Sequence, residues 1–256
     1  MDLGLQDKIV IVSGSSGGIG LAIATAFLSE GARVQISGRT EGKLIKASQM
    51  LAEQYGTDNV QQYCGDLTTP AAINEALEQC ADHFGGIDAL VANIGNGKGS
   101  PGWDIALDDW HSITEANLVG SMVLASSAVP YLKQRENPSI TFISSIAGCE
   151  AIPAPIPYSA AKAALQMAAK NLSRQLGGEG IRVNTIAPGN VLFDGGVWDK
   201  KIKQDSEQVQ DYINTEVPLG RFAEAREIAD AVAFMASTRA RFITGSLLCV
   251  DGGQTR

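Results

Sequence analysis

The feature that most constrains the fold is a glycine-rich turn between a short apolar strand and a helix. Residues 8–13, Lys-Ile-Val-Ile-Val-Ser, are typical of a strand buried on both faces of a parallel sheet. Gly14, Gly18 and Gly20 follow, and residues 21–28 have a helical pattern. Such a turn lets backbone N–H groups approach a phosphate at a helix N-terminus. Glycines also simply permit tight turns, but the order strand, glycines, helix favours phosphate binding.

The rest of the chain repeats this alternation of strands and helices. Further strands are expected at 33–37, 60–64, 86–92, 139–144, 181–187 and 246–250. Helices are expected at 43–54, 71–84, 108–131, 158–176 and 224–237. The pattern predicts the α/β class, with residues 1–256 as a single doubly wound Rossmann-type domain around a mostly parallel seven-stranded sheet. The connection at about 189–216 is unusually long, so we expect a lid or substrate-binding insert there.

Composition excludes several classes of function. Hydrophobic residues make up 45% and charged residues 19%, as in a globular protein. The net charge of −8 argues against a nucleic acid or an anionic membrane as partner. No apolar run reaches the length of a membrane span, and the N-terminus lacks the regions of a signal peptide. These observations predict a cytoplasmic protein.

Cysteine and histidine offer no pattern of metal ligands. The only histidines, His83 and His111, are too few for a His-based metal site. The four cysteines form no Cys-x-x-Cys pair, and we expect buried, reduced thiols at Cys64, Cys80, Cys149 and Cys249.

The end of the second strand bears on the choice of dinucleotide. A carboxylate there would bind a ribose 2′-hydroxyl and repel a 2′-phosphate, but this chain has Gly38 followed by Arg39. NADP(H) is therefore favoured, NAD(H) stays possible, and a solvated surface arginine is the alternative for Arg39. Asp66, after the third strand, could bind the adenine or equally cap the next loop.

A hydroxyl, a phenol and an ammonium occur within one segment. Tyr158 and Lys162 lie four residues apart in a strongly helix-forming run, so they share one face. A positive charge beside a tyrosine lowers its pKa from about 10 toward the working range, which suits proton transfer with a carbonyl or alcohol oxygen. A helix with an exposed lysine and a half-buried tyrosine is the plainer alternative. The fifth strand delivers Ser145 to the same sheet edge.

Two further features point to a ligand pocket at this edge. Asn117 stands inside a helical pattern, which is unfavourable unless its amide has a partner. The loop 93–102 is rich in glycine and lies where open α/β sheets bind ligands. We expect this loop, with Phe193 and Trp198, to line a pocket for an apolar or aromatic substrate.

Over essentially its whole length the sequence resembles the short-chain dehydrogenase/reductase family, and it is most similar to the branch with 3-oxoacyl-thioester reductases. Ser145 lies thirteen residues before Tyr158, which is similar to the family's spacing. The matching residues follow in the family's order: Gly14, Gly18, Gly20, Asp66, Asn93, Gly95, Asn117, Ser145, Tyr158, Lys162, Pro188, Gly189, Asp251, Gly252 and Gly253.

The resemblance implies hydride transfer between a nicotinamide and a ketone or secondary alcohol. Tyr158 would exchange a proton with the substrate oxygen, and Lys162 would lower its pKa and hold the nicotinamide ribose. Ser145, preferred to Ser144 by spacing, would bond the carbonyl, and Asn117 would hold a water that links Lys162 to solvent. A homotetramer, or a homodimer, is also implied. The implied cofactor-binding set is Gly14, Ser15, Ser16, Gly18, Ile19, Gly20, Arg39, Asp66, Leu67, Asn93, Gly95, Tyr158, Lys162, Pro188, Gly189 and Val191.

Four positions depart from the family pattern. Ala92 and Ile94 replace an asparagine and an alanine around Asn93, Phe193 stands where a threonine is usual, and Ser13 replaces a threonine. Three alternatives stay open. One is an NAD-dependent alcohol or sugar dehydrogenase, another is a dinucleotide-binding regulatory protein without turnover, and the third is a subunit whose role is assembly.

Overall fold

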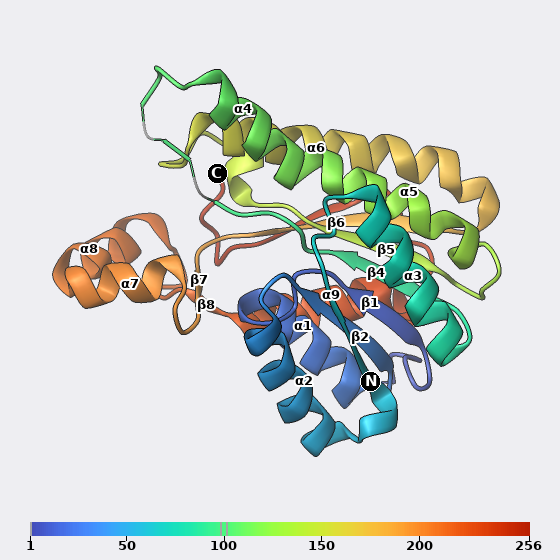
Figure 1. Cartoon of the computed structure of the whole chain (residues 1–256). Helices are drawn as coiled ribbons and strands as arrows, with labels where there is room; N and C mark the ends of the chain where they lie inside the picture. The colour runs from blue at the N-terminus through green and yellow to red at the C-terminus, as the bar shows by residue number, and fades with distance from the viewer. Residues whose placement is uncertain (1, 98, 101) are drawn as a thin grey trace.

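Seven parallel strands form the central sheet in the computed structural model, which describes residues 2–97, 99–100 and 102–256 (Figure 1). Their order is β3-β2-β1-β4-β5-β6-β9, and every neighbouring pair is parallel. The predicted fold class is confirmed. The strands are β1 Ile9–Val12, β2 Arg33–Gly38, β3 Val60–Cys64, β4 Ala89–Ala92, β5 Ser139–Ile143, β6 Arg182–Pro188 and β9 Leu247–Val250.

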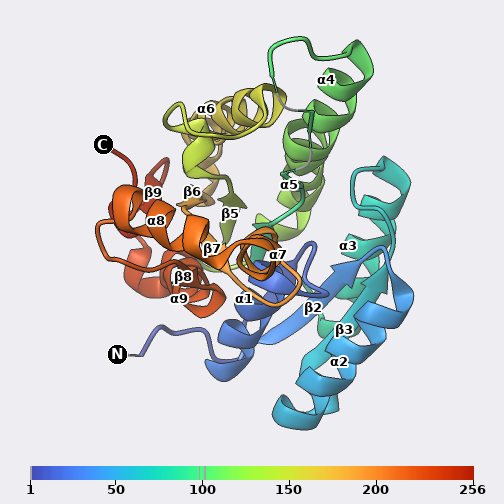
Figure 2. The ribbon, with the colours of Figure 1, turned by 90° about the vertical axis from the view of Figure 1, so that its left-hand side faces the viewer.

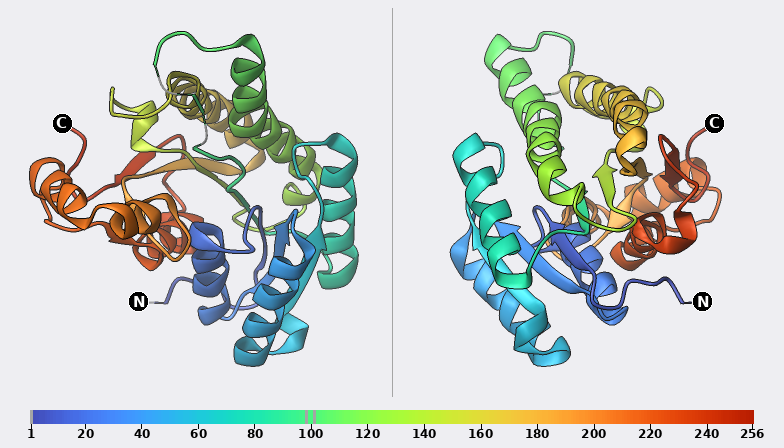
Figure 3. Two further views of the ribbon diagram at one scale, coloured as in Figure 1. Left: turned by 60° about the vertical axis from the view of Figure 1, so that its left-hand side comes forward. Right: turned by 90° about the vertical axis from the view of Figure 1, so that its right-hand side faces the viewer.

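Helices cover both faces of this sheet (Figures 1 and 3). One layer consists of α1 Gly18–Ser29, α2 Glu41–Tyr55 and α9 Ala225–Ala236. The other consists of α3 Pro70–Phe84, α5 Gly120–Leu132 and α6 Ile156–Leu176, with α4 Leu107–Thr114 above it. No helix within the described ranges is long and apolar enough to cross a membrane.

Strand β1 explains why the sequence has a continuous apolar run here. Val10 and Val12 pack into the core beneath α1, α2 and α9. Ile9 and Ile11 point to the opposite core beneath α3, α5 and α6. Successive side chains of a strand face opposite sides, so a strand covered on both faces must be apolar at every position.

The strand order reverses between β1 and β4. From β1 the chain runs outward through β2 to β3, then returns to β4 and continues to the other edge. The connections after β1 and β4 therefore leave in opposite directions, and a crevice opens at the carboxyl ends of these strands. The glycine turn and the loop after Asn93 both begin there.

The helix predicted over 108–131 is interrupted. A wide, π-helical turn, Glu115–Val119, separates α4 from α5. Within it the buried Asn117 amide donates to the Ile113 carbonyl at 3.0 Å. Wide turns of this kind occur mostly at functional sites, and this one aims a polar side chain toward the crevice.

The long connection contains secondary structure of its own. A two-residue strand, β7 Val191–Leu192, pairs with β8 Ala223–Glu224, and α7 Val197–Gln204 and α8 Ser206–Glu216 lie between them. Both helices project beyond the sheet at the left in Figure 1, and they face the viewer in Figure 2. They pack on a small apolar cluster separate from the two main cores, made of Val209, Ile213, Val217 and Phe222.

The cysteines differ from expectation. All four are free thiols, but only Cys80 is buried. Cys64 ends β3, Cys149 follows the turn after β5, and Cys249 lies on the edge strand β9. The prediction of burial was wrong for these three, because strand ends and an edge strand reach the surface.

Candidate active site

Two adjoining cavities occupy the crevice at the carboxyl edge. The first, of about 550 Å³, is lined by the glycine turn and the ends of β2 and β3. The second, of about 500 Å³, is lined by Tyr158, Ser145, Lys162 and residues of α7. They share the lining residues Ile19, Asn93, Ile94, Gly95, Asn96 and Phe193.

The glycine turn is held by backbone constraints. Gly14 and Gly18 have φ angles of 61° and 55°, which favour glycine. A Cβ at Gly20 would clash with the Gly14 carbonyl oxygen. At Gly17, by contrast, a Cβ would meet no atom and would project into space beside the first cavity, which Gly17 lines. The turn is therefore a cradle that keeps its backbone exposed, and it fits the phosphates of a dinucleotide.

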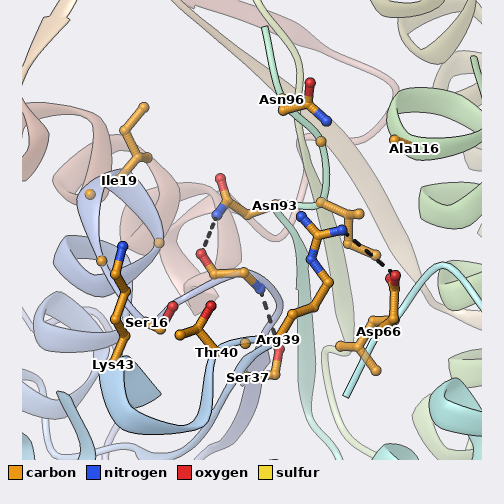
Figure 4. A pocket seen from close by; sticks show the side chains of 18 of the residues that line it. Ser16, Ile19, Ser37, Arg39, Thr40, Lys43, Asp66, Asn93, Asn96 and Ala116 are labelled. Atoms are coloured by element: carbon orange, nitrogen blue, oxygen red, sulfur yellow. Dashed lines mark hydrogen bonds and ion pairs between the residues drawn. The ribbon is translucent and has the colours of Figure 1, made fainter. Parts of the chain in front are cut away.

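Asn93 ties this turn to the end of β4. Its Nδ2 donates to the carbonyls of Ser13 at 3.2 Å and Gly14 at 3.1 Å (Figure 4). Ser15, in the predicted cofactor set, does not line the cavity. Its hydroxyl donates to Val12 O at 2.6 Å and accepts from Ser37 N at 2.9 Å. The Ser15 side chain therefore joins β1 to β2.

Charged and polar side chains gather at the far end of the first cavity (Figure 4). Arg39 lies 3.6 Å from Asp66, and both are exposed. Burial pushes the pKa of Asp66 upward, but hydrogen bonds from Thr68 and the Arg39 charge outweigh it and lower the pKa. Asp66 caps its own loop, as one of the two sequence readings had it, by accepting from Thr68 Oγ at 2.9 Å.

Lys43 is a second cation at this end, and sequence reasoning missed it. It lies in the first turn of α2 and lines the same cavity as Arg39. The signal was present, because the first turn of a helix that follows a parallel strand stays near the strand's carboxyl edge. Two basic side chains, Arg39 and Lys43, are thus placed to contact a 2′-phosphate of the cofactor.

Tyr158, Ser145 and Lys162 meet at the wall of the second cavity. Tyr158 is in the first turn of α6, and Ser145 caps the short helix η3, Ile146–Gly148. Lys162 is buried one turn further on. Its Nζ donates to Ile143 O at 2.9 Å and lies 5.8 Å from the centre of the Tyr158 ring. Burial lowers the pKa of Lys162 to about 8.

The pKa of Tyr158 is shifted in the direction opposite to the sequence prediction. Burial raises it, and the hydrogen bond with Ser145 only partly counteracts this. An ionised phenol is unfavourable away from water, and the Lys162 ammonium points at Ile143 O. Tyr158 is therefore a protonated phenol at neutral pH in this structure.

The two neighbouring serines face different partners. The Ser144 hydroxyl is buried, donates to Lys162 O at 3.2 Å and accepts from Gln166 at 3.0 Å. The Ser145 hydroxyl accepts from Ala147 N at 3.1 Å, and it lies close enough to Tyr158 to lower the pKa of that phenol. Gln166, which sequence reasoning missed, also donates to Ser145 O at 3.1 Å. Its position four residues after Lys162 was the available signal.

Asn117 clamps the loop after β4 against Lys162. Its Nδ2 donates to Asn96 O at 3.2 Å, and its Oδ1 accepts from Asn96 N at 3.1 Å. Gly95 passes between them, where a Cβ would clash with Asn117 Oδ1 and lie 3.3 Å from Lys162 Nζ. The water-holding role of Asn117 stays a prediction. Lys98 and Pro101 of this loop lie outside the described residues.

Two of the departures from the family pattern lie at the junction of the cavities, whereas Ser13 and Ala92 are fully buried. Phe193 and Ile94 line both of them. The Phe193 ring covers the glycine turn, since a Cβ at Gly18 would lie 2.9 Å from it. Leu67 lines the first cavity, while Pro188, Gly189 and Val191 line the second.

A phosphate cradle joined to a phenol, a hydroxyl and a buried ammonium is the equipment of a dinucleotide-dependent oxidoreductase. Comparison with known proteins agrees. The family model described as Enoyl-(Acyl carrier protein) reductase matches residues 14–255. The chain therefore belongs to the short-chain dehydrogenase/reductase family, as the sequence motifs predicted, and it is an oxidoreductase.

Individual relatives cover nearly the whole chain. It is 31% identical over 251 residues to 2-(S)-hydroxypropyl-CoM dehydrogenase 3 of Xanthobacter autotrophicus, spanning 98% of each. It is 36% identical over 251 residues to the 3-oxoacyl-(acyl-carrier-protein) reductase of Chlamydia muridarum, spanning 97% of this chain and 98% of the relative. The L-sorbose reductase of Gluconobacter frateurii, solved with NADPH and L-sorbose, superposes with a TM-score of 0.94 at 32% identity, covering 100% and 99% of the two chains.

Proposed function

We propose that this protein reduces a ketone to a secondary alcohol with NADPH. The observation that carries the proposal is the position of the Tyr158–Ser145 pair on a cavity that adjoins the glycine-turn cradle. A nicotinamide cofactor, when bound, supplies the hydride. The chain itself has to hold the ketone, polarise its oxygen and deliver a proton.

Ser145 and Tyr158 perform these tasks at the carbonyl oxygen. Both hydroxyls donate hydrogen bonds to it, and Tyr158 transfers its proton as negative charge develops there. The raised pKa of Tyr158 suits this direction, because the phenol holds its proton at neutral pH. Lys162, with a pKa of about 8, is charged at neutral pH and stabilises the phenolate left behind.

Arg39 and Lys43 support the preference for NADP(H). Both line the cradle's far end, where β2 ends in Gly38 instead of a carboxylate, and the Asp66 carboxylate at this end is paired with Arg39. Arg39→Ala should weaken NADPH binding by about tenfold or more and NADH binding little. Titrations of NADPH and NADH by fluorescence or calorimetry measure both constants. Equal losses would remove the 2′-phosphate role of Arg39, and an NADH preference of the unchanged protein would favour alcohol oxidation with NAD.

Turnover is tested by screening ketones, including 3-oxoacyl thioesters, with NADPH. Consumption of NADPH with at least one ketone supports the proposal. Tight binding without turnover of any ketone would favour a regulatory dinucleotide-binding protein instead.

We further propose a single domain over residues 1–256 in which the segment 189–216 acts as a lid. Its α7 and α8 project over the carboxyl edge and pack on their own small cluster, so they can move with little disturbance of the main cores. Saturating NADPH should slow proteolytic cleavage within 189–216. An unchanged cleavage rate would argue against a lid.

A cytoplasmic homotetramer, or a homodimer, is the proposed assembly. Apolar side chains are exposed on α6 and on the edge strand β9, namely Met167, Leu247 and Leu248. The outer edge of β9 has no neighbouring strand in the seven-stranded sheet. Exposed apolar groups beside an open edge mark an interface. Light scattering should give four times, or for a homodimer twice, the mass of the 26.9 kDa chain, and a monomer would contradict the proposal.

A further inference from the structure

The cavity beside Tyr158 has an uneven charge. None of the described residues that line it is an aspartate or a glutamate, and its two cationic side chains are Lys162 and Lys201. The chain as a whole carries a net charge of −8. A region without carboxylates is therefore a local exception in an acidic protein.

Lys162 already has a role in the proton-transfer group. It is buried, and its ammonium donates to Ile143 O at 2.9 Å. Lys201, on α7, is exposed and lines the cavity from the insert. It forms no ion pair with any residue that the structure describes.

The other two lysines of α7 are placed differently. Lys203 is neutralised by Asp199 at 2.7 Å and lies 3.9 Å from Asp194. Lys200 does not line the cavity. Helical spacing thus gives the three lysines different positions. Lys203 is paired with a carboxylate, Lys200 lies outside the cavity, and Lys201 lines it.

An aromatic stack holds Lys201 in position. Its Nζ lies 4.4 Å from the centre of the Trp198 ring. Trp198 in turn stacks on Tyr212 at 5.0 Å and packs against Phe222 at 4.4 Å. A cation over an aromatic face is attracted to it but keeps its full charge, so Lys201 remains available to an anion.

Several apolar side chains line the cavity that Lys201 shares with the catalytic pair. Ile94, Ile152, Pro153, Pro155 and Val197 all line it. A molecule with a carbonyl at one end, an apolar body and an anion at the other matches this arrangement.

We propose that the substrate is a ketone that carries a carboxylate or sulfonate, and that Lys201 binds this anionic group. The inference rests on the ketone reduction proposed above and specifies its substrate class. Lys201 does not bind the phosphates of a dinucleotide, because it does not line the glycine-turn cavity. Lys201 is thus a specificity-determining residue and takes no part in proton transfer.

The test compares each oxo acid with its own methyl ester. The carboxylate probes are 3-oxobutanoate, 4-oxopentanoate and 5-oxohexanoate, in which the carboxylate lies at increasing distance from the ketone. The sulfonate probes are ethanesulfonates that carry the same oxo chains. The purified protein is assayed with NADPH. Lys201→Gln is the variant, and Lys200→Gln is the matched control because it removes the same charge one residue away, outside the cavity.

We expect the best acid to have a kcat/KM at least tenfold above its neutral ester. Lys201→Gln should remove this advantage through KM, leaving kcat and the NADPH dissociation constant within twofold, while Lys200→Gln changes neither. A higher salt concentration should lower kcat/KM for the acid but not for its ester. Whether carboxylates or sulfonates are preferred identifies which anion the site takes.

Three results would overturn the inference in distinguishable ways. Equal rates for acids and esters would leave the ketone reductase intact but without anion recognition. Equal effects of the two lysine variants would mean that only the overall charge matters. Loss of NADPH binding in Lys201→Gln would reassign Lys201 to the cofactor. Absence of turnover with every ketone, acid or ester, would instead defeat the proposed function on which the inference rests.

Discussion

The two ends of the crevice are built by different means. At the dinucleotide end, backbone geometry fixes the shape: positive φ angles at Gly14 and Gly18, and a Gly20 that has no room for a Cβ. At the substrate end, one wall of the cavity is formed by side chains of the short helix α7, among them Trp198, which packs on a cluster outside the main cores. Backbone constraints tolerate little change, whereas side chains on an insert can vary without cost to the fold. The contrast explains why one scaffold can keep its cofactor and vary its substrates.

The largest effect on turnover is expected where the dinucleotide end and the substrate end of the crevice adjoin. Tyr158→Phe removes the proton donor but keeps the ring, so turnover should fall by about 100- to 10,000-fold. The NADPH dissociation constant, measured by fluorescence titration, should stay within about twofold of the unchanged protein. A variant that retains more than a tenth of the activity would exclude Tyr158 as the general acid.

A matched pair of glycine variants tests the rigidity of the dinucleotide end. Gly20→Ala should lower the free energy of unfolding by about 2 kcal/mol or more, because its Cβ meets backbone. Gly17→Ala has extended φ and open space, so its thermal midpoint should hardly change. Because Gly17 lines the cradle, the added methyl group should nevertheless weaken NADPH binding at least about tenfold. Equal stability losses in both variants would contradict this description.

The pH dependence of stability tests the buried Lys162. Its pKa falls by burial from 10.5 in the unfolded chain to about 8 in the folded one. Between these values the unfolded chain binds more protons, so stability rises with pH through this window. From pH 7.5 to 9.5 the protein should gain about 2 kcal/mol relative to Lys162→Met. Urea unfolding at both pH values measures this, and parallel curves for the two proteins would exclude the shift.

The smallest effect is expected from a substitution in the insert at 189–216. Trp198→Ala removes the support of Lys201 at the substrate end and should raise KM for a ketone about tenfold. The thermal midpoint and NADPH binding should change little, because Trp198 packs on the separate cluster. Phe27→Ala, in the main core, is the contrasting control and should cost about 3–5 kcal/mol. A comparable loss in Trp198→Ala would show that the insert is part of the main fold.

Sequence reasoning predicted the sheet and the cradle because their signals are local. A strand buried on both faces must be apolar at each position, as Ile9–Val12 is, and glycines with positive φ cannot be exchanged freely. The family spacing also predicted Ser145 rather than Ser144, although the roles of both stay to be tested. These features depend on a few consecutive residues.

The features that were missed depend on long-range contacts. The pKa of Tyr158 was predicted in the wrong direction because burial by distant elements outweighs a neighbour in sequence. Gln166 acts on Ser144 and Ser145 across an interface of helix and strand end. Lys201 resembles Lys200 in the sequence, and only the packing of α7 separates them.

The wide turn at Glu115–Val119 has a consequence for the length of the chain. A π-helical turn contains one residue more than the corresponding α-helical turn, so it is equivalent to a single-residue insertion in an otherwise continuous helix. Deleting one residue there would close the wide turn into a regular helix and remove the bulge that directs Asn117 toward the crevice. Asn117 would then lose its grip on the loop after β4. This segment therefore tolerates substitutions at its surface but no change in residue number.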